Sequence, residues 1–96
     1  MHKHQELLST LGQLVRSTRS LQMDQKELGL RVGIGRNTVS AIENGKSVNS
    51  ESLALVLAHL NIADDIQELI DTKLKESERN LVRKSRLPHQ ELDNDF

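Results

Sequence analysis

The chain has 96 residues, enough for one small domain, and a formal net charge of −1. It contains no cysteine, which excludes disulfides and thiolate metal sites, and its single aromatic residue, Phe96, argues against single-strand binding by base stacking. No apolar run approaches the ~20 residues of a membrane span and no signal peptide is evident, so we expect a cytoplasmic protein without a membrane partner.

Charge is unevenly distributed along the sequence. Residues 1–62 hold seven Lys or Arg and five Asp or Glu, a balance of +2, whereas residues 63–96 hold six and nine, a balance of −3. Imbalances of this size also occur on ordinary solvated surfaces. They favour the first part of the chain as the place of any contact with nucleic acid.

The first six residues are expected to form a flexible N-terminus. His2 and His4 lie in this segment without a third ligand nearby in the sequence, so no metal site and no cofactor are predicted.

An amphipathic helix is expected from residue 7 to about Arg19. Apolar side chains follow the spacing of one helical face, namely Leu7, Leu8, Leu11, Leu14 and Val15. Gly12 should weaken the middle of this helix. The helix is expected to pack across the back of the motif that follows.

The stretch from Asp24 to Gly45 predicts two short helices joined by a tight turn. Asp24 can cap the first helix, and Glu27, three residues on, can complete a capping box. Gly33 should end that helix, since glycine is favoured just past a helix end. The second helix is predicted over residues 36–44.

The second helix of this motif has two different faces. Val39 and Ile42 fall on one side, and the other side carries hydrogen-bonding and small residues, namely Arg36, Asn37, Ser40, Ala41 and Asn44. Such a helix suits the major groove of DNA, where an arginine fork matches guanine and an asparagine amide matches adenine.

The motif resembles the helix-turn-helix of the Xre family of phage-repressor and Cro-like regulators. The matching positions, in order and without a gap, are Asp24, Gln25, Glu27, Leu28, Gly29, Gly33, Ile34, Gly35, Val39, Ser40, Ile42, Glu43 and Gly45. The departures are Asp24 for Ser or Thr, Gly29 for Ala, Gly35 for Ser and Val39 for Ile. Because the family has Ala at position 29, we expect Gly29→Ala to be neutral or stabilising.

The resemblance implies an all-α, five-helix Xre and lambda-repressor-like DNA-binding domain with a C-terminal arm. The residues that it places against base edges are Arg36, Asn37 and Ala41, and those that it places at the DNA backbone or in bracing are Gln25, Thr38, Ser40, Asn44 and Lys46. Gln25 is expected to bond a phosphate and to brace Arg36. Arg19 is implied to pair with Glu43, unless Arg16 and Arg19 are solvated. Family members bind palindromic double-stranded DNA as homodimers.

Two further helices are expected after the motif. Asn49 or Ser50 can cap the first, whose apolar positions are Leu53, Val56, Leu57 and Leu60, and Asn61 interrupts the pattern. The second helix begins near Asp64 and carries Ile66, Leu69, Ile70 and Leu74. We expect Leu69, Ile70 and Leu74 to form a two-fold dimer interface.

The domain is therefore expected over residues 7–75, followed by a charged, partly disordered arm over residues 76–96. The arm either remains solvated or folds on a partner, through its basic part on DNA or through its end on a protein.

Two functions fit the sequence. The first is a sequence-specific transcriptional regulator that represses its own operon. The alternative is an antitoxin, resembling those of the HipB type, that neutralises a partner toxin through the arm and autoregulates. No catalytic residues are predicted, since the sequence has no Cys nucleophile, no clustered His and no phosphate-cradling loop, and an enzyme is not expected.

Overall fold

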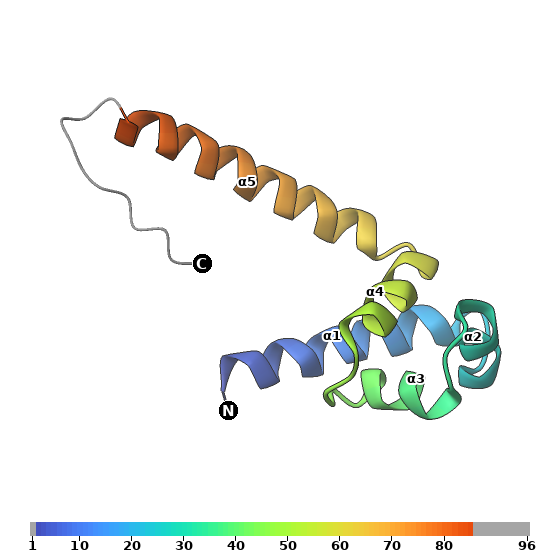
Figure 1. Ribbon diagram of the computed structural model, residues 1–96. Coiled ribbons are helices and arrows are strands. Elements are labelled where there is room, and N and C mark those ends of the chain that lie inside the picture. Colours follow the sequence, from blue (N-terminus) through green and yellow to red (C-terminus); the bar gives the residue numbers. More distant parts are fainter. Residues whose placement is uncertain (1, 86–96) are drawn as a thin grey trace. The chain divides into compact units, whose positions relative to one another are not determined.

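The computed structural model describes residues 2–85 as five α-helices, with no strand in that range (Figure 1). They are α1 (Lys3–Ser20), α2 (Gln25–Val32), α3 (Arg36–Glu43), α4 (Ser50–His59) and α5 (Ala63–Ser85). The predicted all-α, five-helix fold is confirmed. The chain divides into two units, one ending at Asp64 and the other starting at Asp65.

Helix α1 begins earlier than the sequence pattern indicated. Its N-cap is His2, so residues 3–6 of the expected flexible N-terminus are helical. Glu6 lies in the first turn, where a negative charge stabilises the positive end of a helix, and it pairs with Lys3 at 3.7 Å.

Gly12 allows α1 and α3 to approach closely. A Cβ atom at Gly12 would lie 2.5 Å from the carbonyl oxygen of Ile42 and 2.7 Å from that of Glu43. No real Cβ atom is tolerated at such a distance from backbone, so only glycine fits here without a shift of one helix. The sequence had indicated only that Gly12 weakens its own helix.

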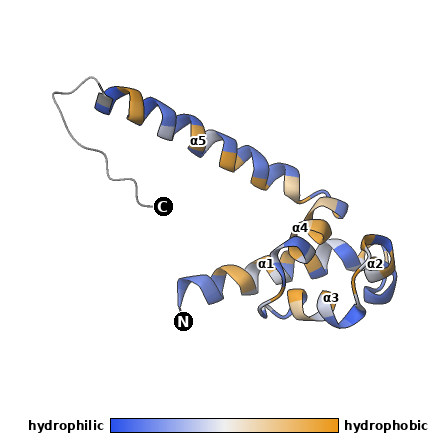
Figure 2. Ribbon diagram, viewed as in Figure 1, coloured by the Kyte–Doolittle hydropathy of each residue, from blue (hydrophilic) through white to orange (hydrophobic). Residues whose placement is uncertain are grey.

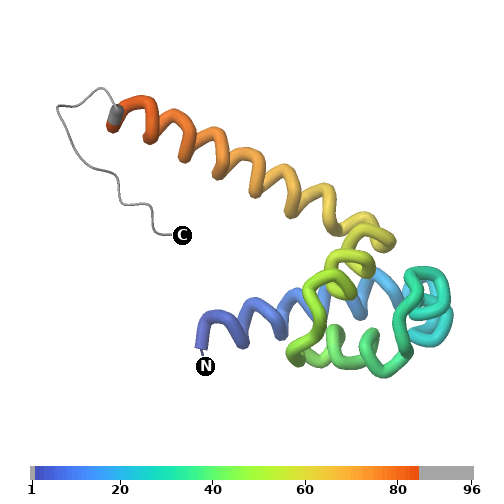
Figure 3. The backbone as a smooth tube through the Cα atoms, viewed as in Figure 1, coloured from blue at the N-terminus to red at the C-terminus, as the bar shows by residue number. Residues whose placement is uncertain are grey.

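The turn between α2 and α3 is built as predicted (Figure 3). The Asp24 carboxylate caps α2 by accepting a hydrogen bond from the backbone N–H of Glu27 at 2.8 Å. Gly33 ends α2 in the left-handed region at φ +80°, a conformation that glycine adopts without strain.

The expectation that Gly29→Ala is neutral or stabilising is wrong in this geometry. A Cβ atom at Gly29 would lie 2.7 Å from the carbonyl oxygen of Ile34, which belongs to the backbone of the turn. Helix propensity favours alanine, but the turn would have to move to accommodate it, so Gly29→Ala is expected to lower the stability.

The core of the first unit joins α1, α2, α3 and α4. Its buried apolar side chains are Val15, Leu28, Val39, Ile42, Val56, Leu57, Leu60 and Ile62. Helix α4 is capped by Asn49, whose side chain accepts from the backbone N–H groups of Glu51 and Ser52, and Asn61 follows it at φ +63°.

Helix α5 is longer than expected. It continues past Leu74 to Ser85, so the predicted boundary between residues 75 and 76 lies inside a helix. The reason is local: this stretch has no Gly or Pro and is rich in the helix formers Lys, Glu, Arg and Leu. Apolar and polar residues alternate around its turns (Figure 2). The rest of the predicted arm, residues 86–96, lies outside the described residues.

Candidate nucleic-acid interface

Helix α3 has one buried side and one open side. Val39, Ile42 and Glu43 are buried, whereas Arg36, Asn37 and Asn44 are exposed. The smaller predicted contact residues, Thr38, Ser40 and Ala41, are half-buried. The packing thus fixes α3 by its inner face and leaves the predicted base-contacting end in solvent.

The first turn of α3 also offers backbone donors. Its N-cap is Gly35, which has no side chain to satisfy the N–H groups of that turn. These backbone N–H groups lie beside Arg36, the first residue of α3. The positive end of the helix dipole and a guanidinium group therefore lie close together.

A buried carboxylate holds α3 to α1. The side chain of Glu43 has no exposed surface, and that of Arg19 is 11% exposed. Arg19 donates from Nε to Oε2 of Glu43 at 2.6 Å and from Nη2 to Oε1 at 3.0 Å, a bidentate pair. A further Arg19 nitrogen, Nη1, donates to the carbonyl of Met23 at 3.0 Å. The pair that the family resemblance implied is therefore present in the structure.

The network shifts the pKa values of both partners. Burial by itself raises the pKa of the Glu43 carboxyl group, but the hydrogen bonds from Arg19 and Gln25 and the charge of Arg19 outweigh it. The pKa of Glu43 therefore lies below its ordinary value. The hydrogen bond to Glu43 raises the pKa of Arg19, against a smaller effect of burial. Both groups are charged in the folded protein at neutral pH.

Two more side chains donate to Glu43. Gln25 donates from Nε2 to Oε1 at 2.9 Å, and Arg16 donates from Nε to the same oxygen at 3.3 Å. Gln25, at the start of α2, thus joins a third helix to the pair. The sequence had suggested that Gln25 braces Arg36, whereas the hydrogen bond that the structure gives it is to Glu43. Arg16 is 57% exposed and is the weaker of the two arginine partners.

An open cleft of about 420 Å³ lies beside this network. It is lined by Arg19, Asp24, Gln25, Lys26 and Arg36, which are three cationic side chains, one carboxylate and one amide. Such a basic recess at the N-terminus of a helix suits a phosphate group. Sequence reasoning did not select Lys26, although it directly follows Gln25 in the matched motif and is exposed.

The remaining predicted contact residues lie near the C-terminal end of α3. Asn44 donates from Nδ2 to the hydroxyl of Ser40 at 3.5 Å, and the exposed Lys46 follows the turn at Gly45. The structure therefore places cationic side chains near both ends of α3, with Arg36 and Lys26 near its start and Lys46 after its end.

The other predicted residues lie elsewhere. Leu69, Ile70 and Leu74 are exposed on α5, in the second unit. The rings of His2 and His4 stack at 5.8 Å, and no group of three or more metal-ligating side chains occurs in residues 2–85. No helix in the described range is long and apolar enough to cross a membrane.

Comparison with known proteins gives one finding. A family model described as helix-turn-helix matches residues 18–66, just over half of the chain, from the end of α1 to the start of α5. No curated protein and no solved structure matches the chain.

Proposed function

Since the chain belongs to the helix-turn-helix family of the Xre and lambda-repressor type and is a DNA-binding transcription regulator, we propose that it inserts α3 into the major groove of a specific operator. Within the groove, Arg36 and Asn37 contact base edges and Ala41 contacts a thymine methyl group. We place the protein in the cytoplasm, where it represses its own operon.

The observation that carries this proposal is the two-sided environment of α3. Four donors from three side chains hold the buried Glu43 at its C-terminal end, and Val39 fills the core behind it. The helix is thus held by its inner face, with Arg36 and Asn37 in solvent. A recognition helix needs this combination, because base contacts require precise placement and open side chains.

In the proposed complex with DNA, phosphate contacts lie on both sides of α3. The cleft with Lys26 and Gln25 receives a phosphate at one end, and Lys46 meets the backbone at the other, with Thr38, Ser40 and Asn44 between them. Gln25 keeps its second amide N–H to donate to a phosphate oxygen and its carbonyl oxygen to accept from Arg36. These contacts fix the register of the protein on the duplex without selecting sequence.

A binding series over operators that differ by one base pair tests the placement of α3. Arg36→Ala should cost about 1–3 kcal/mol on the best operator and abolish discrimination at one base pair per half-site, because a bidentate contact to guanine is lost. The operator is first found by mapping the DNA that the protein protects upstream of its own gene.

Lys46→Ala is the matched control in this series. A lost phosphate contact should weaken binding to all sequences alike and reduce the salt dependence of the affinity by about one unit of slope. If Arg36→Ala behaves as Lys46→Ala does, Arg36 contacts the backbone and α3 does not lie in the groove as proposed.

The alternative function is an antitoxin that binds a toxin through the C-terminal part of the chain and autoregulates. Unlike repression, the antitoxin function depends on a second protein. A toxin encoded next to this gene, whose activity the protein abolishes and whose binding is lost on deletion of residues 86–96, would favour the antitoxin. Unchanged operator binding by the deleted protein would separate this role from repression.

A further inference from the structure

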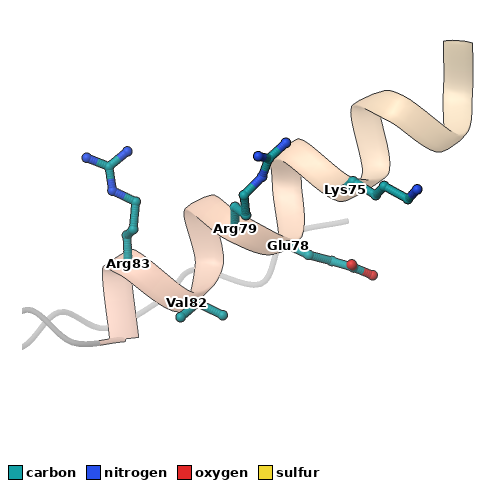
Figure 4. A pocket seen from close by; sticks show the side chains of 5 residues that line it. All are labelled: Lys75, Glu78, Arg79, Val82 and Arg83. Atoms are coloured by element: carbon teal, nitrogen blue, oxygen red, sulfur yellow. The ribbon is translucent and has the colours of Figure 1, made fainter.

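Helix α5 carries an open furrow near its C-terminal end. The furrow measures about 620 Å³ and is lined by residues three or four positions apart, namely Lys75, Glu78, Arg79, Val82 and Arg83. Since residues at this spacing share one face of a helix, the furrow runs along the helix axis. Arg79 and Arg83 extend to one side of it, and Val82 extends to the other (Figure 4).

Lys75, Arg79 and Arg83 form one wall of the furrow. They follow one another at intervals of four residues, so their positions repeat about every 6 Å along the helix. None of the three forms an ion pair within residues 2–85. This wall is therefore a row of three positive charges without a paired carboxylate in the described part of the chain.

The other wall is mainly apolar. It lies one position earlier at each turn and consists of Glu78 and Val82, and Leu74 continues it toward the start of α5. More than half of the surface of Leu74 and of Val82 is exposed. An occupant that fits this furrow needs acidic groups along one side and apolar groups along the other.

The sequence that follows α5 has this pattern. Residues 89–96, outside the described range, contain no Lys or Arg and have acidic residues at alternate positions, namely Glu91, Asp93 and Asp95. The positions between and after them are Leu92, Asn94 and Phe96. In an extended chain, alternate side chains point to the same side about 7 Å apart, which is close to the 6 Å repeat of the basic wall.

The segment is long enough to return along α5. Lys75 lies ten residues before Ser85, about 15 Å along the helix, whereas residues 86–96 span up to about 36 Å when extended. Pro88 disfavours continuation of the helix. Because the segment and the furrow belong to one chain, the effective concentration of the segment is on the order of millimolar.

We infer that residues 91–96 dock in the furrow of their own chain, in the direction opposite to α5. The acidic residues then meet the basic wall in the pairs Glu91–Arg83, Asp93–Arg79 and Asp95–Lys75. The apolar residues meet the other wall in the pairs Leu92–Val82 and Phe96–Leu74. The docked segment neutralises a row of cations that would otherwise attract nucleic acid of any sequence. This contact goes beyond operator reading by α3 and does not depend on it.

A nitroxide label on Asn94→Cys tests the contact in the full chain, which has no other cysteine. The relaxation enhancement of backbone amide signals in α5 should have its maximum near Glu78. It should weaken in about 1 M salt, because exposed ion pairs are screened. An enhancement that falls steadily from Ser85 toward Ile66 would show an undocked segment and overturn the inference. Enhancement in an unlabelled chain mixed with the labelled one would show docking on another copy and would also overturn it.

Charge reversal tests the register. Arg79→Glu and Asp93→Lys should each abolish the maximum near Glu78, and the two together should restore it, because the pair re-forms with opposite signs. Lys84→Glu is the matched control, since position 84 lies about 180° around the helix from Lys75, and it should leave the maximum unchanged. Equal effects of Arg79→Glu and Lys84→Glu would refute the register.

Affinity for DNA of unrelated sequence tests the neutralisation of the basic wall. Asp93→Asn should raise this affinity roughly threefold more than Glu68→Gln, which removes the same charge from α5 outside the furrow. Equal increases would mean that the segment does not shield the cations. Operator discrimination by Arg36, measured on the same proteins, tests the proposed function separately.

Discussion

Helices α1 and α5 are the two longest helices in residues 2–85 and both carry an apolar stripe, yet they differ in how they are held. In α1, Val15 is fully buried, Gly12 lies against the backbone of α3 and Arg19 pairs with the buried Glu43. In α5, Leu69, Leu74 and Leu81 are each more than half exposed.

This difference teaches that an apolar stripe does not identify the partner of a helix. Besides the buried Val15, what attaches α1 is a glycine that permits close approach and a charge pair that demands precise geometry, and neither of these belongs to the stripe. Helix α5 has no glycine, and its acidic residues gather near its start and its basic residues near its end. The two helices are therefore expected to respond differently to substitution.

The largest expected effect is on the attachment of α1. Glu43→Gln should lower the free energy of unfolding by about 3–5 kcal/mol, because the buried guanidinium of Arg19 loses its counter-charge. Denaturant unfolding measures the loss. Arg16→Ala, which removes the exposed partner of the same carboxylate, should cost less than about 1 kcal/mol. Equal losses of unfolding free energy in Glu43→Gln and Arg16→Ala would mean that the Arg19–Glu43 pair is not what attaches α1 to α3.

The close approach of α1 and α3 gives the next prediction. Gly12→Ala should cost about 1–3 kcal/mol, since the added methyl group would meet two backbone carbonyl groups of α3, at Ile42 and Glu43. Gly35→Ala is the control: its Cβ would have no neighbour nearer than 4.0 Å, and its cost should stay below about 1 kcal/mol. An increase in melting temperature for Gly12→Ala would show that helix propensity outweighs the contact.

Low pH should weaken the attachment of α1 to α3 through the Glu43 carboxylate. The pKa of Glu43 is lower in the folded protein than its ordinary value, so its contribution to stability is complete above the unfolded pKa of about 4.3. The contribution is lost as the pH falls through the lower, folded pKa. Stability measured from pH 6 to pH 2 should therefore fall more steeply below about pH 4.3 in the wild type than in Glu43→Gln. Parallel curves would contradict this role for Glu43.

The smallest expected effect is that of a substitution in α5 on the free energy of unfolding. Leu81→Ala should change the unfolding free energy by less than about 0.5 kcal/mol at concentrations where the chain is monomeric, because the leucine is already exposed. Val15→Ala, the corresponding change in α1, should cost about 1.5–3 kcal/mol. The contrast would vanish if α5 were part of the same core, and calorimetry of the two variants decides this.

Much of the fold follows from local sequence signals. The cap at Asp24, the left-handed turn at Gly33 and the two-sided pattern of residues 36–44 predicted the helix-turn-helix, because caps, glycines and periodicity act within a few residues. The predictions missed the start of α1 and the end of α5, since apolar periodicity says little about charged segments that are helical by propensity. The cleft residue Lys26 was missed because a lone lysine carries no spacing signal.

The sequence by itself therefore determined the helical class, the turn and the residues that α3 exposes, and through them the family. Only the tertiary structure decided that Gly12 and Gly29 face backbone across a contact, and that Gln25 and Arg16 join Arg19 on the carboxylate of Glu43. The physical reason is distance along the chain. Arg19 and Glu43 are 24 residues apart, so their pairing depends on how three helices pack and leaves no periodic trace in the sequence.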